Sequence, residues 1–384
     1  MRLAIINMTS GGMSGGYRKY LQNVLPRMAA HPDVEAILCV SPEVLSVQDW
    51  FGPLSNVEFV RCQPFRFLRH KVSSELRHYL KRFHPDVIFI PVERFFEFEG
   101  IPIANVIQNM EPFVAIDGNP LNERFRNRFR RLVGRRALKK STRVIAISRH
   151  VRNFLIQDLN IPNDRIGLVY HGVDLPENKD VHRPNIIPKG WDGRFLFTAG
   201  SIRPARGLED ILGALKQLGN KSLDISGLVI AGSTTPGMER YQKQLAKWAR
   251  GNDISSKICW AGSLKEKEMT WCYQNCSIFV MTSRVEACPN IALEAMAHGT
   301  ICISADNPPL PEIFGDTAGF YPPEKPQILA KRIQEVLHWT EERKQEMRQR
   351  ALTRASQFSW DKCAERTVEE LRKAIDDFKK CKNG

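Results

Sequence analysis

Two glutamates that follow a short apolar run have the type and spacing of groups that bind hydroxyls. Glu286 and Glu294 are separated by seven residues and come after the apolar residues 278–281. Pro289 is typical of a helix start and Gly299 of a helix end, so a helix is predicted between them. The first carboxylate then precedes the helix and the second lies inside it. Because each carboxylate accepts several hydrogen bonds, the pair suits two sugar rings of one ligand.

The start of this helix is predicted to bind phosphate. Backbone N–H groups in the first turn of a helix have no partner within the helix, and the helix dipole adds partial positive charge there. We therefore place a phosphate site at Cys288, Pro289, Asn290 and Ile291.

A second candidate phosphate site follows the apolar run 195–199, where Gly200 is succeeded by Arg203 and Arg206. A guanidinium presents a planar fork of donors that matches phosphate oxygens. Each hydrogen bond to a charged group contributes about 1.5–3 kcal/mol. The alternative interpretation is two solvated loop arginines.

A glycine-rich segment, Gly11-Gly-Met-Ser-Gly-Gly-Tyr17, stands between the first expected strand and the first expected helix. Glycines allow the backbone to approach a ligand closely, and Gly15 and Gly16 would lie at the helix start. The spacing is not the dinucleotide-binding fingerprint, so this segment alone is weak support.

These segments sit within a regular alternation of β-branched runs and amphipathic stretches, which predicts parallel sheets covered by helices. In a first domain, residues 1–175, strands are expected at 3–6, 34–40, 57–61, 87–90, 106–108, 143–147 and 166–169, with helices at 17–30, 73–83 and 125–139. In a second, residues 194–359, strands are expected at 195–199, 228–231, 258–260, 278–281 and 301–304, with helices at 208–218, 238–249 and 289–298.

The proline-containing residues 176–193 have no apolar period and are predicted to be a linker. A closing helix, 360–384, is expected to cross back to the first domain. Ligands of open α/β sheets bind beyond the carboxyl ends of the strands. The predicted fold class is thus α/β, with two Rossmann-like parallel-sheet domains that face each other across a cleft.

The pattern of Glu286, seven residues, then Glu294-Ala-Met-Ala-His-Gly resembles the signature of glycosyltransferase family 4, whose members are retaining enzymes of the GT-B fold. The resemblance implies that Glu286 contacts the donor sugar as a catalytic residue and that Glu294 binds the ribose. Arg206 falls on the lysine of the family's diphosphate loop. Ser201 stands where the family has an arginine, and Arg203 is the nearest replacement.

The resemblance also assigns roles in the first domain. A glycine-rich loop of the family closes over the donor phosphate, which implies contacts from Gly15 and Gly16. Many members carry a histidine where this chain has Gln108-Asn109-Met110-Glu111. An amide cannot act as a base near neutral pH, but it can orient a sugar by hydrogen bonds. Asn109 is therefore predicted to position the reacting sugar, and Glu111 the acceptor.

The overall composition sets further expectations. The 384 residues carry a formal charge of +14 and 42% hydrophobic residues, with no apolar run long enough for a membrane span or signal peptide. Nine irregularly placed cysteines indicate reduced, mostly buried thiols. These features predict a cytoplasmic protein. They also predict an anionic partner without identifying it.

One basic segment could bind such an anionic partner. Ten lysines and arginines and no acid stand between positions 124 and 143, with large apolar residues among them. This pattern is consistent with a solvated helix face and also with a helix that binds an anionic membrane surface. The residues predicted to contact the acceptor or the membrane are Arg128, Arg130, Arg131 and Arg135. The segment 65–83 is also basic. No nucleic-acid-binding motif accompanies the charge, so no nucleic acid is predicted as a partner.

The sequence thus predicts a retaining glycosyltransferase that moves a hexose from a nucleotide-diphosphate sugar to a glycan or lipid-linked acceptor, in cell-surface polysaccharide or glycolipid synthesis. The donor is a substrate, and neither a cofactor nor a metal is expected, because no Asp-x-Asp motif serves the donor site. The alternatives are a nucleotide-sugar epimerase or sucrose-type synthase of the same fold, or a basic nucleic-acid-binding protein.

Overall fold

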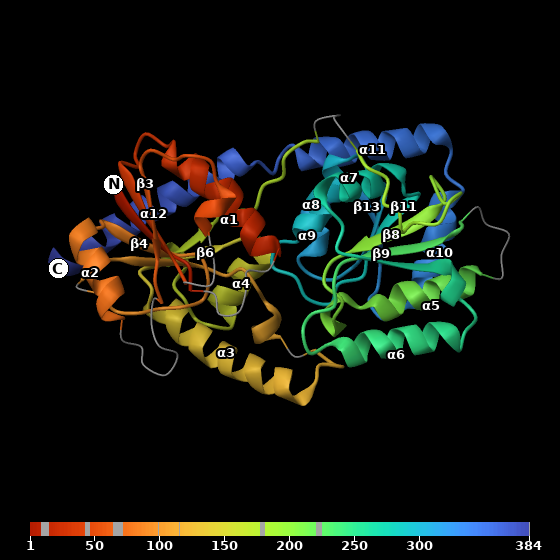
Figure 1. Cartoon of the computed structure of the whole chain (residues 1–384), viewed down its shortest axis with the longest axis horizontal. Helices are drawn as coiled ribbons and strands as arrows, with labels where there is room; N and C mark the ends of the chain where they lie inside the picture. The colour runs from red at the N-terminus through yellow and green to blue at the C-terminus, as the bar shows by residue number, and fades with distance from the viewer. Residues whose placement is uncertain are drawn as a thin grey trace. The chain divides into compact units, whose positions relative to one another are not determined.

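A computed structural model describes residues 1–8, 15–42, 47–63, 72–98, 100–114, 116–176, 181–219 and 225–383 (Figure 1). Most of the glycine-rich segment, and residues 64–71 of the second basic segment, lie outside these ranges. The chain divides into two compact units. The first comprises Met1–Phe113, Arg126–Gly172 and Ser359–Gly384, and the second Val114–Phe125 and Val173–Phe358.

The first unit contains a seven-stranded parallel sheet in the order β3-β2-β1-β4-β5-β6-β7. Its strands are β1 (Arg2–Ile6), β2 (Ala36–Ser41), β3 (Val57–Arg61), β4 (Val87–Ile90), β5 (Ile103–Val106), β6 (Arg143–Ala146) and β7 (Ile166–Leu168). The strand order reverses between β1 and β4, so ligand-binding loops are expected at the carboxyl ends of these two strands.

Strand β5 is one place where the sequence prediction was wrong, because the strand runs over Ile103–Val106 and not over 106–108. Asn105 interrupts the apolar pattern, which hid the start of the strand. Its buried side-chain amide donates to the carbonyl oxygens of Val92 at 2.9 Å and Arg94 at 2.6 Å, and it also pairs with Ser141. A polar side chain is tolerated here because its hydrogen bonds are satisfied.

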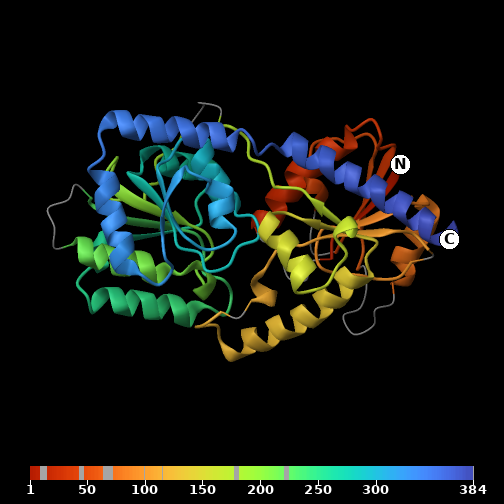
Figure 2. The ribbon, with the colours of Figure 1, turned by 180° about the vertical axis from the view of Figure 1, so that it is seen from behind.

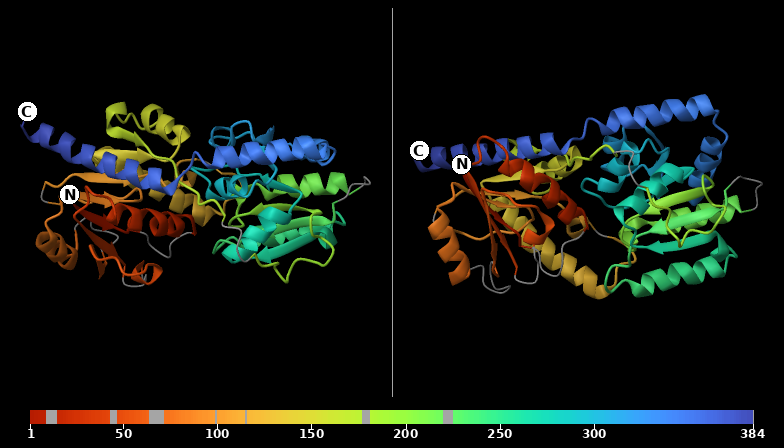
Figure 3. Two further views of the ribbon diagram at one scale, coloured as in Figure 1. Left: turned by 90° about the horizontal axis from the view of Figure 1, so that it is seen from above. Right: turned by 45° about the horizontal axis from the view of Figure 1, so that its top comes forward.

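Helices cover both faces of this sheet. They are α1 (Gly15–Ala29), α2 (Ser74–Phe83), α4 (Arg149–Gln157), α12 (Trp360–Asn383) and α3 (Leu121–Lys140), which belongs to the first unit from Arg126 onward. Short turns are η1 (Val47–Trp50), η2 (Glu111–Phe113) and η3 (Asn163–Arg165). One face of strands β1, β2 and β4 forms a buried apolar cluster with α2. Helix α12 lies beside α1 and contacts β4, β5 and β6 (Figures 2 and 3).

The C-terminal helix α12 is tied to the first unit by charge as well as by packing. Arg143 on β6 is buried and forms ion pairs with Glu370 at 2.7 Å and with Asp377 at 2.6 Å. Burial alone would lower the pKa of Arg143, but its hydrogen bonds to Asp377 and Glu370 raise it above the usual value. Breaking such a pair would leave a buried charge uncompensated.

The second unit contains six parallel strands in the order β10-β9-β8-β11-β12-β13. Its strands are β8 (Phe195–Ala199), β9 (Gly227–Ala231), β10 (Ile258–Gly262), β11 (Ile278–Met281), β12 (Cys302–Ala305) and β13 (Ala318–Tyr321). The order reverses between β8 and β11. The structure thus contains two parallel-sheet α/β units, as the sequence predicted.

Helices also cover both faces of the second sheet, with α5 and α6 on one side and α8 and α11 on the other (Figures 1 and 2). The helices are α5 (Leu208–Leu218), α6 (Glu239–Arg250), α7 (Glu266–Asn275), α8 (Asn290–Ala297), α9 (Leu310–Phe314), α10 (Pro326–Leu337) and α11 (Glu341–Ala355), with turns η4 (Pro204–Arg206) and η5 (Ser255–Lys257). Residues 181–193, expected as part of a linker, pack on this unit and bury Ile187 and Trp191.

Among the described residues, no helix combines the length and the apolar character needed to cross a bilayer. No disulfide joins the cysteines, and eight of the nine are buried.

Candidate active site

The strand order of the second unit brings two predicted site loops together. Strands β8 and β11 are adjacent and parallel, with Leu196 in register with Ile278. Their carboxyl ends therefore meet at the same edge of the sheet, where the strand order reverses. The loop after β8 carries Arg203 and Arg206, and the loop after β11 carries Glu286.

Hydrogen bonds to the backbone hold these two loops side by side. The Thr282 hydroxyl donates to the carbonyl oxygen of Arg206 at 2.6 Å, and the Arg284 N–H donates to the carbonyl oxygen of Ala205 at 2.8 Å. These bonds hold together the backbone of the two loops from which the site side chains extend.

Arg206 and Glu286 form an ion pair across the two loops, although they are 80 residues apart in the sequence. Arg206 also donates to the Ser283 hydroxyl at 3.1 Å. The two charged side chains are only 21% and 15% exposed, so solvent screens the pair less than it would a surface pair. An anion that binds Arg206 would have to share it with Glu286.

Arg203 completes a group of three charges in this site. Burial, together with the nearby guanidinium of Arg206, lowers the pKa of Arg203 to about 10, and Glu286 counteracts the effect. The side chain stays protonated near neutral pH. Two arginines and one carboxylate leave a local excess of positive charge, which a diphosphate would neutralise.

Gly200 is needed because Arg206 passes close to the backbone. Its φ of 119° belongs to glycine, and a Cβ atom at this position would lie 2.6 Å from the Arg206 guanidinium carbon. Any side chain there would displace the arginine.

A buried carboxylate supports the loop after β11. Asp210 on α5 is 2% exposed and accepts two hydrogen bonds from Arg284, at 2.7 and 2.8 Å. The Tyr321 hydroxyl donates to it at 2.9 Å and the Glu324 N–H at 3.0 Å. Asp210 and Arg284 therefore stabilise the loop that carries Glu286.

The predicted helix after this loop is α8, which begins at Asn290 with Pro289 at the preceding capping position. The N–H groups of Ala292 and Leu293 donate to the Pro289 carbonyl oxygen at 3.1 and 3.4 Å. Ile291 comes before the first N–H groups that donate within the helix. An N–H group at this position of a helix start can bind an anion. Cys288 is buried at 7% exposure.

Glu294 lies inside α8, and its carboxylate is oriented by a residue that the sequence reasoning missed. The Tyr273 hydroxyl, on α7, donates to Glu294 Oε2 at 3.0 Å. The Tyr273 ring stacks on His298 with 5.1 Å between ring centroids. Burial, followed by the charge of Glu294, raises the pKa of Tyr273 well above its usual value, so the hydroxyl remains a donor. In the sequence, Tyr273 cannot be distinguished from an aromatic residue of the core, so its hydrogen bond to Glu294 was not predicted.

In the first unit, α1 begins at Gly15, and Gly15 and Gly16 are both exposed. A buried polar network lies close to this helix start. Asn7, which follows β1, donates to the Ser41 hydroxyl at 3.0 Å and accepts a hydrogen bond from Tyr17. A Cβ atom on Gly15 would meet no atom within 4 Å among the residues that the structure describes, so these residues leave room for a methyl group there.

The first unit also orders the segment that contains Asn109. Glu93, which follows β4, accepts hydrogen bonds from the N–H groups of Gln108 at 2.9 Å and Asn109 at 3.4 Å. Burial raises the pKa of Glu93, while these backbone donors lower it. Asn109 is exposed and accepts from the Glu111 N–H at 2.9 Å, and Glu111 itself is buried at 4% exposure. Glu93 was not predicted, because an isolated loop glutamate carries no sequence signal.

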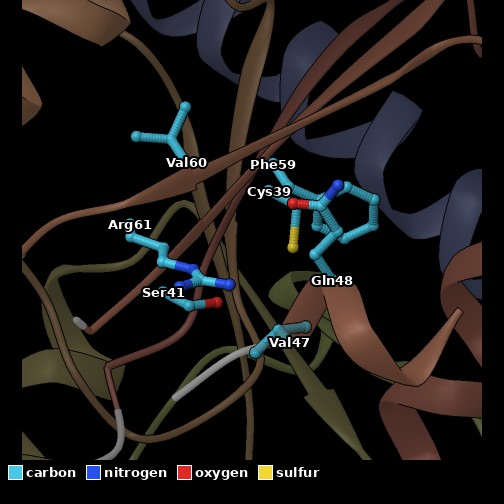
Figure 4. Close-up of a pocket in the computed structure, with 7 residues that line it drawn as sticks. All are labelled: Cys39, Ser41, Val47, Gln48, Phe59, Val60 and Arg61. Atoms are coloured by element: carbon cyan, nitrogen blue, oxygen red, sulfur yellow. The ribbon is translucent and has the colours of Figure 1, made fainter. Parts of the chain in front are cut away.

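A small cavity of about 10 Å³ opens at the carboxyl ends of β2 and β3 (Figure 4). This is room for about one water molecule. Its lining consists of Cys39, Ser41, Val47, Gln48, Phe59, Val60 and Arg61. A cavity of this size does not accommodate a nucleotide.

Four arginines of the basic segment that were predicted as acceptor or membrane contacts lie on α3. Arg128 and Arg131 are exposed, and Arg135 is half-buried and donates to the Asp158 carbonyl oxygen at 3.3 Å. Arg130 donates to the Asn127 side chain at 3.3 Å.

The two doubly wound parallel sheets, the second with an arginine and glutamate pair at its switch point, have the architecture of the GT-B fold. The family model for glycosyl transferases group 1 matches residues 183–354, and that for Glycosyltransferase Family 4 matches residues 15–177. The chain belongs to this family of glycosyltransferases.

Similar proteins agree with this assignment. The serotype-specific mannosyltransferase WbdA of Escherichia coli is 23% identical over 259 residues, which are 64% of this chain and 30% of that protein. The D-inositol 3-phosphate glycosyltransferase of Frankia alni is 26% identical over 263 residues, 64% of this chain and 62% of that protein. The chain thus matches less than two thirds of the length of either relative.

Among solved structures, Anabaena HepE in complex with UDP and glucose has a similar fold, with a TM-score of 0.72 and 17% identity. The superposition covers 97% of this chain and 100% of that chain.

Proposed function

We propose that the protein is a retaining glycosyltransferase that moves a hexose from a nucleotide-diphosphate sugar to a glycan or lipid-linked acceptor, in the synthesis of a cell-surface polysaccharide or glycolipid. The observation that carries this proposal is the group of Arg203, Arg206 and Glu286 at the switch point of the second sheet. The complex of HepE with UDP and glucose, and the mannosyltransferase and inositol phosphate glycosyltransferase relatives, support a sugar donor of this type.

In this proposal the second unit binds the donor. Arg206 and Arg203 bind the diphosphate, together with the backbone at the start of α8 from Cys288 to Ile291. Glu294, oriented by Tyr273, accepts hydrogen bonds from the ribose hydroxyls.

Glu286 is proposed to bind the donor sugar. The diphosphate draws Arg206 toward itself, which leaves the Glu286 carboxylate available to the sugar hydroxyls. The bond between the sugar C1 and the leaving phosphate oxygen then breaks, and a bond between C1 and the acceptor oxygen forms on the same face. The acceptor proton passes to the leaving phosphate, whose charge the two arginines stabilise.

The first unit is proposed to contribute further contacts to the donor and to the acceptor. The backbone at Gly15 and Gly16 would approach the donor phosphate, and the exposed Asn109 would orient the reacting sugar by hydrogen bonds. Glu111 is buried and its backbone N–H donates to the Asn109 side chain, so it would act on the acceptor through Asn109 and not by direct contact. Glu93 is proposed to hold Asn109 in place.

The reaction is proposed to need no metal, because guanidinium groups and a helix start neutralise the diphosphate. Transfer measured with an excess of chelator should equal transfer without it. Loss of activity in chelator, restored by Mg²⁺ or Mn²⁺, would contradict this part of the proposal.

A panel of nucleoside diphosphates and their hexose derivatives tests the proposal by thermal unfolding. A ligand that binds the native state raises the midpoint in proportion to RT ln(1 + [L]/Kd). One nucleotide should stabilise the wild type, and the Arg206→Ala variant should lose that shift. Stabilisation by no nucleotide in the panel, together with retention on nucleic acid, would favour the nucleic-acid-binding alternative.

A further inference from the structure

Helix α3 exposes a row of large apolar side chains. Leu121, Phe125, Phe129 and Leu132 follow one another at intervals of four, four and three residues, which places them on one face of the helix. Their exposed fractions are 70%, 71%, 46% and 54%. Apolar side chains that gather in a continuous exposed row, unlike scattered ones, mark an interaction surface.

The opposite face of α3 already supplies the contacts that the fold needs. Its buried residues are Asn127, Gly134, Ala137 and Leu138. Gly134 allows close packing, since a Cβ atom there would lie 3.0 Å from the ring of Phe113. The exposed row is therefore not part of the apolar core of the protein.

Positive charge surrounds the exposed row. Glu123 is the one acidic residue of α3, against nine lysines and arginines. Arg128, Arg131, Arg136 and Lys139 are exposed and form no ion pair with any residue that the structure describes. Other cations of the helix are partly neutralised, as Lys140 is by Glu97 at 2.7 Å.

We propose that α3 binds the interface of an anionic lipid bilayer, with Phe125, Phe129 and Leu132 entering the boundary of the acyl chains and the cations on lipid phosphates. An amphipathic helix with aromatic and leucine residues on one face and cations beside them has the composition of an interfacial helix. Nucleic acid would account for the charge, but it gives no reason for an apolar row between the cations. The inference goes beyond the proposed reaction, since donor binding does not depend on it.

Sedimentation with vesicles tests the role of charge. Wild-type protein should sediment with phosphatidylcholine vesicles that contain phosphatidylglycerol, and stay in the supernatant with phosphatidylcholine alone. Replacing four exposed cations by serine should lower the partition coefficient by about a hundredfold or more, because each cation near such a surface adds to binding. The variant carries Arg128→Ser, Arg131→Ser, Arg136→Ser and Lys139→Ser.

Helix α6 provides a matched control, because it also exposes four cations and a large apolar residue, Trp248. The control variant carries Arg240→Ser, Lys243→Ser, Lys247→Ser and Arg250→Ser, and it has the same net charge as the α3 variant. It should bind vesicles much better than the α3 variant. Equal loss in the two variants would mean that net charge alone attracts the protein, and would overturn the assignment to α3.

A second variant tests insertion of the apolar row, with all cations retained. Phe125→Ser, Phe129→Ser and Leu132→Ser together should lower partitioning by about tenfold or more. They should also abolish the part of binding that persists at high salt. Wild-type-like binding in this variant would overturn insertion. Donor-induced thermal stabilisation should be unchanged in every variant, so a failure of membrane binding is separate from a failure of the proposed reaction.

Discussion

The ion pair between Arg206 and Glu286 predicts that two substitutions in one site change affinity for a nucleoside diphosphate in opposite directions. Arg206→Ala removes at least one charged hydrogen bond, about 1.5–3 kcal/mol, from the bound diphosphate. Its Kd should therefore rise about 10- to 150-fold, at about 1.4 kcal/mol for each factor of ten. Glu286→Gln removes the group that competes for Arg206. An exposed ion pair contributes up to about 1 kcal/mol, and this pair is less screened, so the Kd should fall by about fivefold or more.

Calorimetric titration measures both changes, with the nucleoside diphosphate that best stabilises the wild type as ligand. Arg332→Ala is a matched control, because that arginine is exposed on α10 and, among the described residues, its ion pair is with the nearby Glu335 at 2.8 Å. It should bind like the wild type. Glu286→Gln should also lose sugar transfer despite its tighter binding of the diphosphate. An equal loss of affinity in the Arg206 and Glu286 variants would refute competition between the carboxylate and the ligand.

Four further predictions follow from the same geometry. Glu294→Ala should raise KM for the donor about 10- to 100-fold by loss of charged hydrogen bonds, and Tyr273→Phe should raise it by less. Glu286→Ala should instead lower kcat by about a hundredfold or more, and unchanged kinetics in either glutamate variant would contradict its assignment. Gly15→Ala should leave the thermal midpoint unchanged or slightly higher, because the described residues leave space for the methyl group. It should nevertheless weaken donor binding, because the methyl group would keep the backbone from approaching the phosphate. Burial raises the folded-state pKa of Glu93, so its contribution to stability is complete below its unfolded pKa and falls as pH rises through the folded pKa. In urea unfolding, the Glu93→Gln variant should therefore become more stable relative to the wild type as pH rises above the usual range of a glutamate pKa, and a pH-independent difference would contradict this.

The sequence predicted the fold because alternating apolar runs of the right length determine an α/β class. It missed strand β13, Ala318–Tyr321, since a short segment with alanine and glycine has little strand character and becomes a strand by pairing with β12. The predicted bounds of strand β5 were wrong because Asn105 is polar, and its burial depends on hydrogen-bond partners from other segments.

The candidate site was predictable only in part. The motif around Glu286 and the arginines of the loop after β8 were found separately, because each has a local pattern. Their ion pair depends on the adjacency of β8 and β11, which follows from the strand order and not from either motif. Tyr273 acts through a contact between helices, and no sequence pattern distinguishes it from a core aromatic residue.

The most direct test of the account is a structure with bound donor, determined with the nucleotide sugar that stabilises the protein most. The account predicts diphosphate oxygens within hydrogen-bond distance of Arg206 and of the backbone at the start of α8. It also predicts ribose hydroxyls on Glu294, and a Glu286 carboxylate that has left Arg206 for the sugar. A diphosphate bound away from these residues, or an intact Arg206–Glu286 pair beside a bound donor, would contradict it.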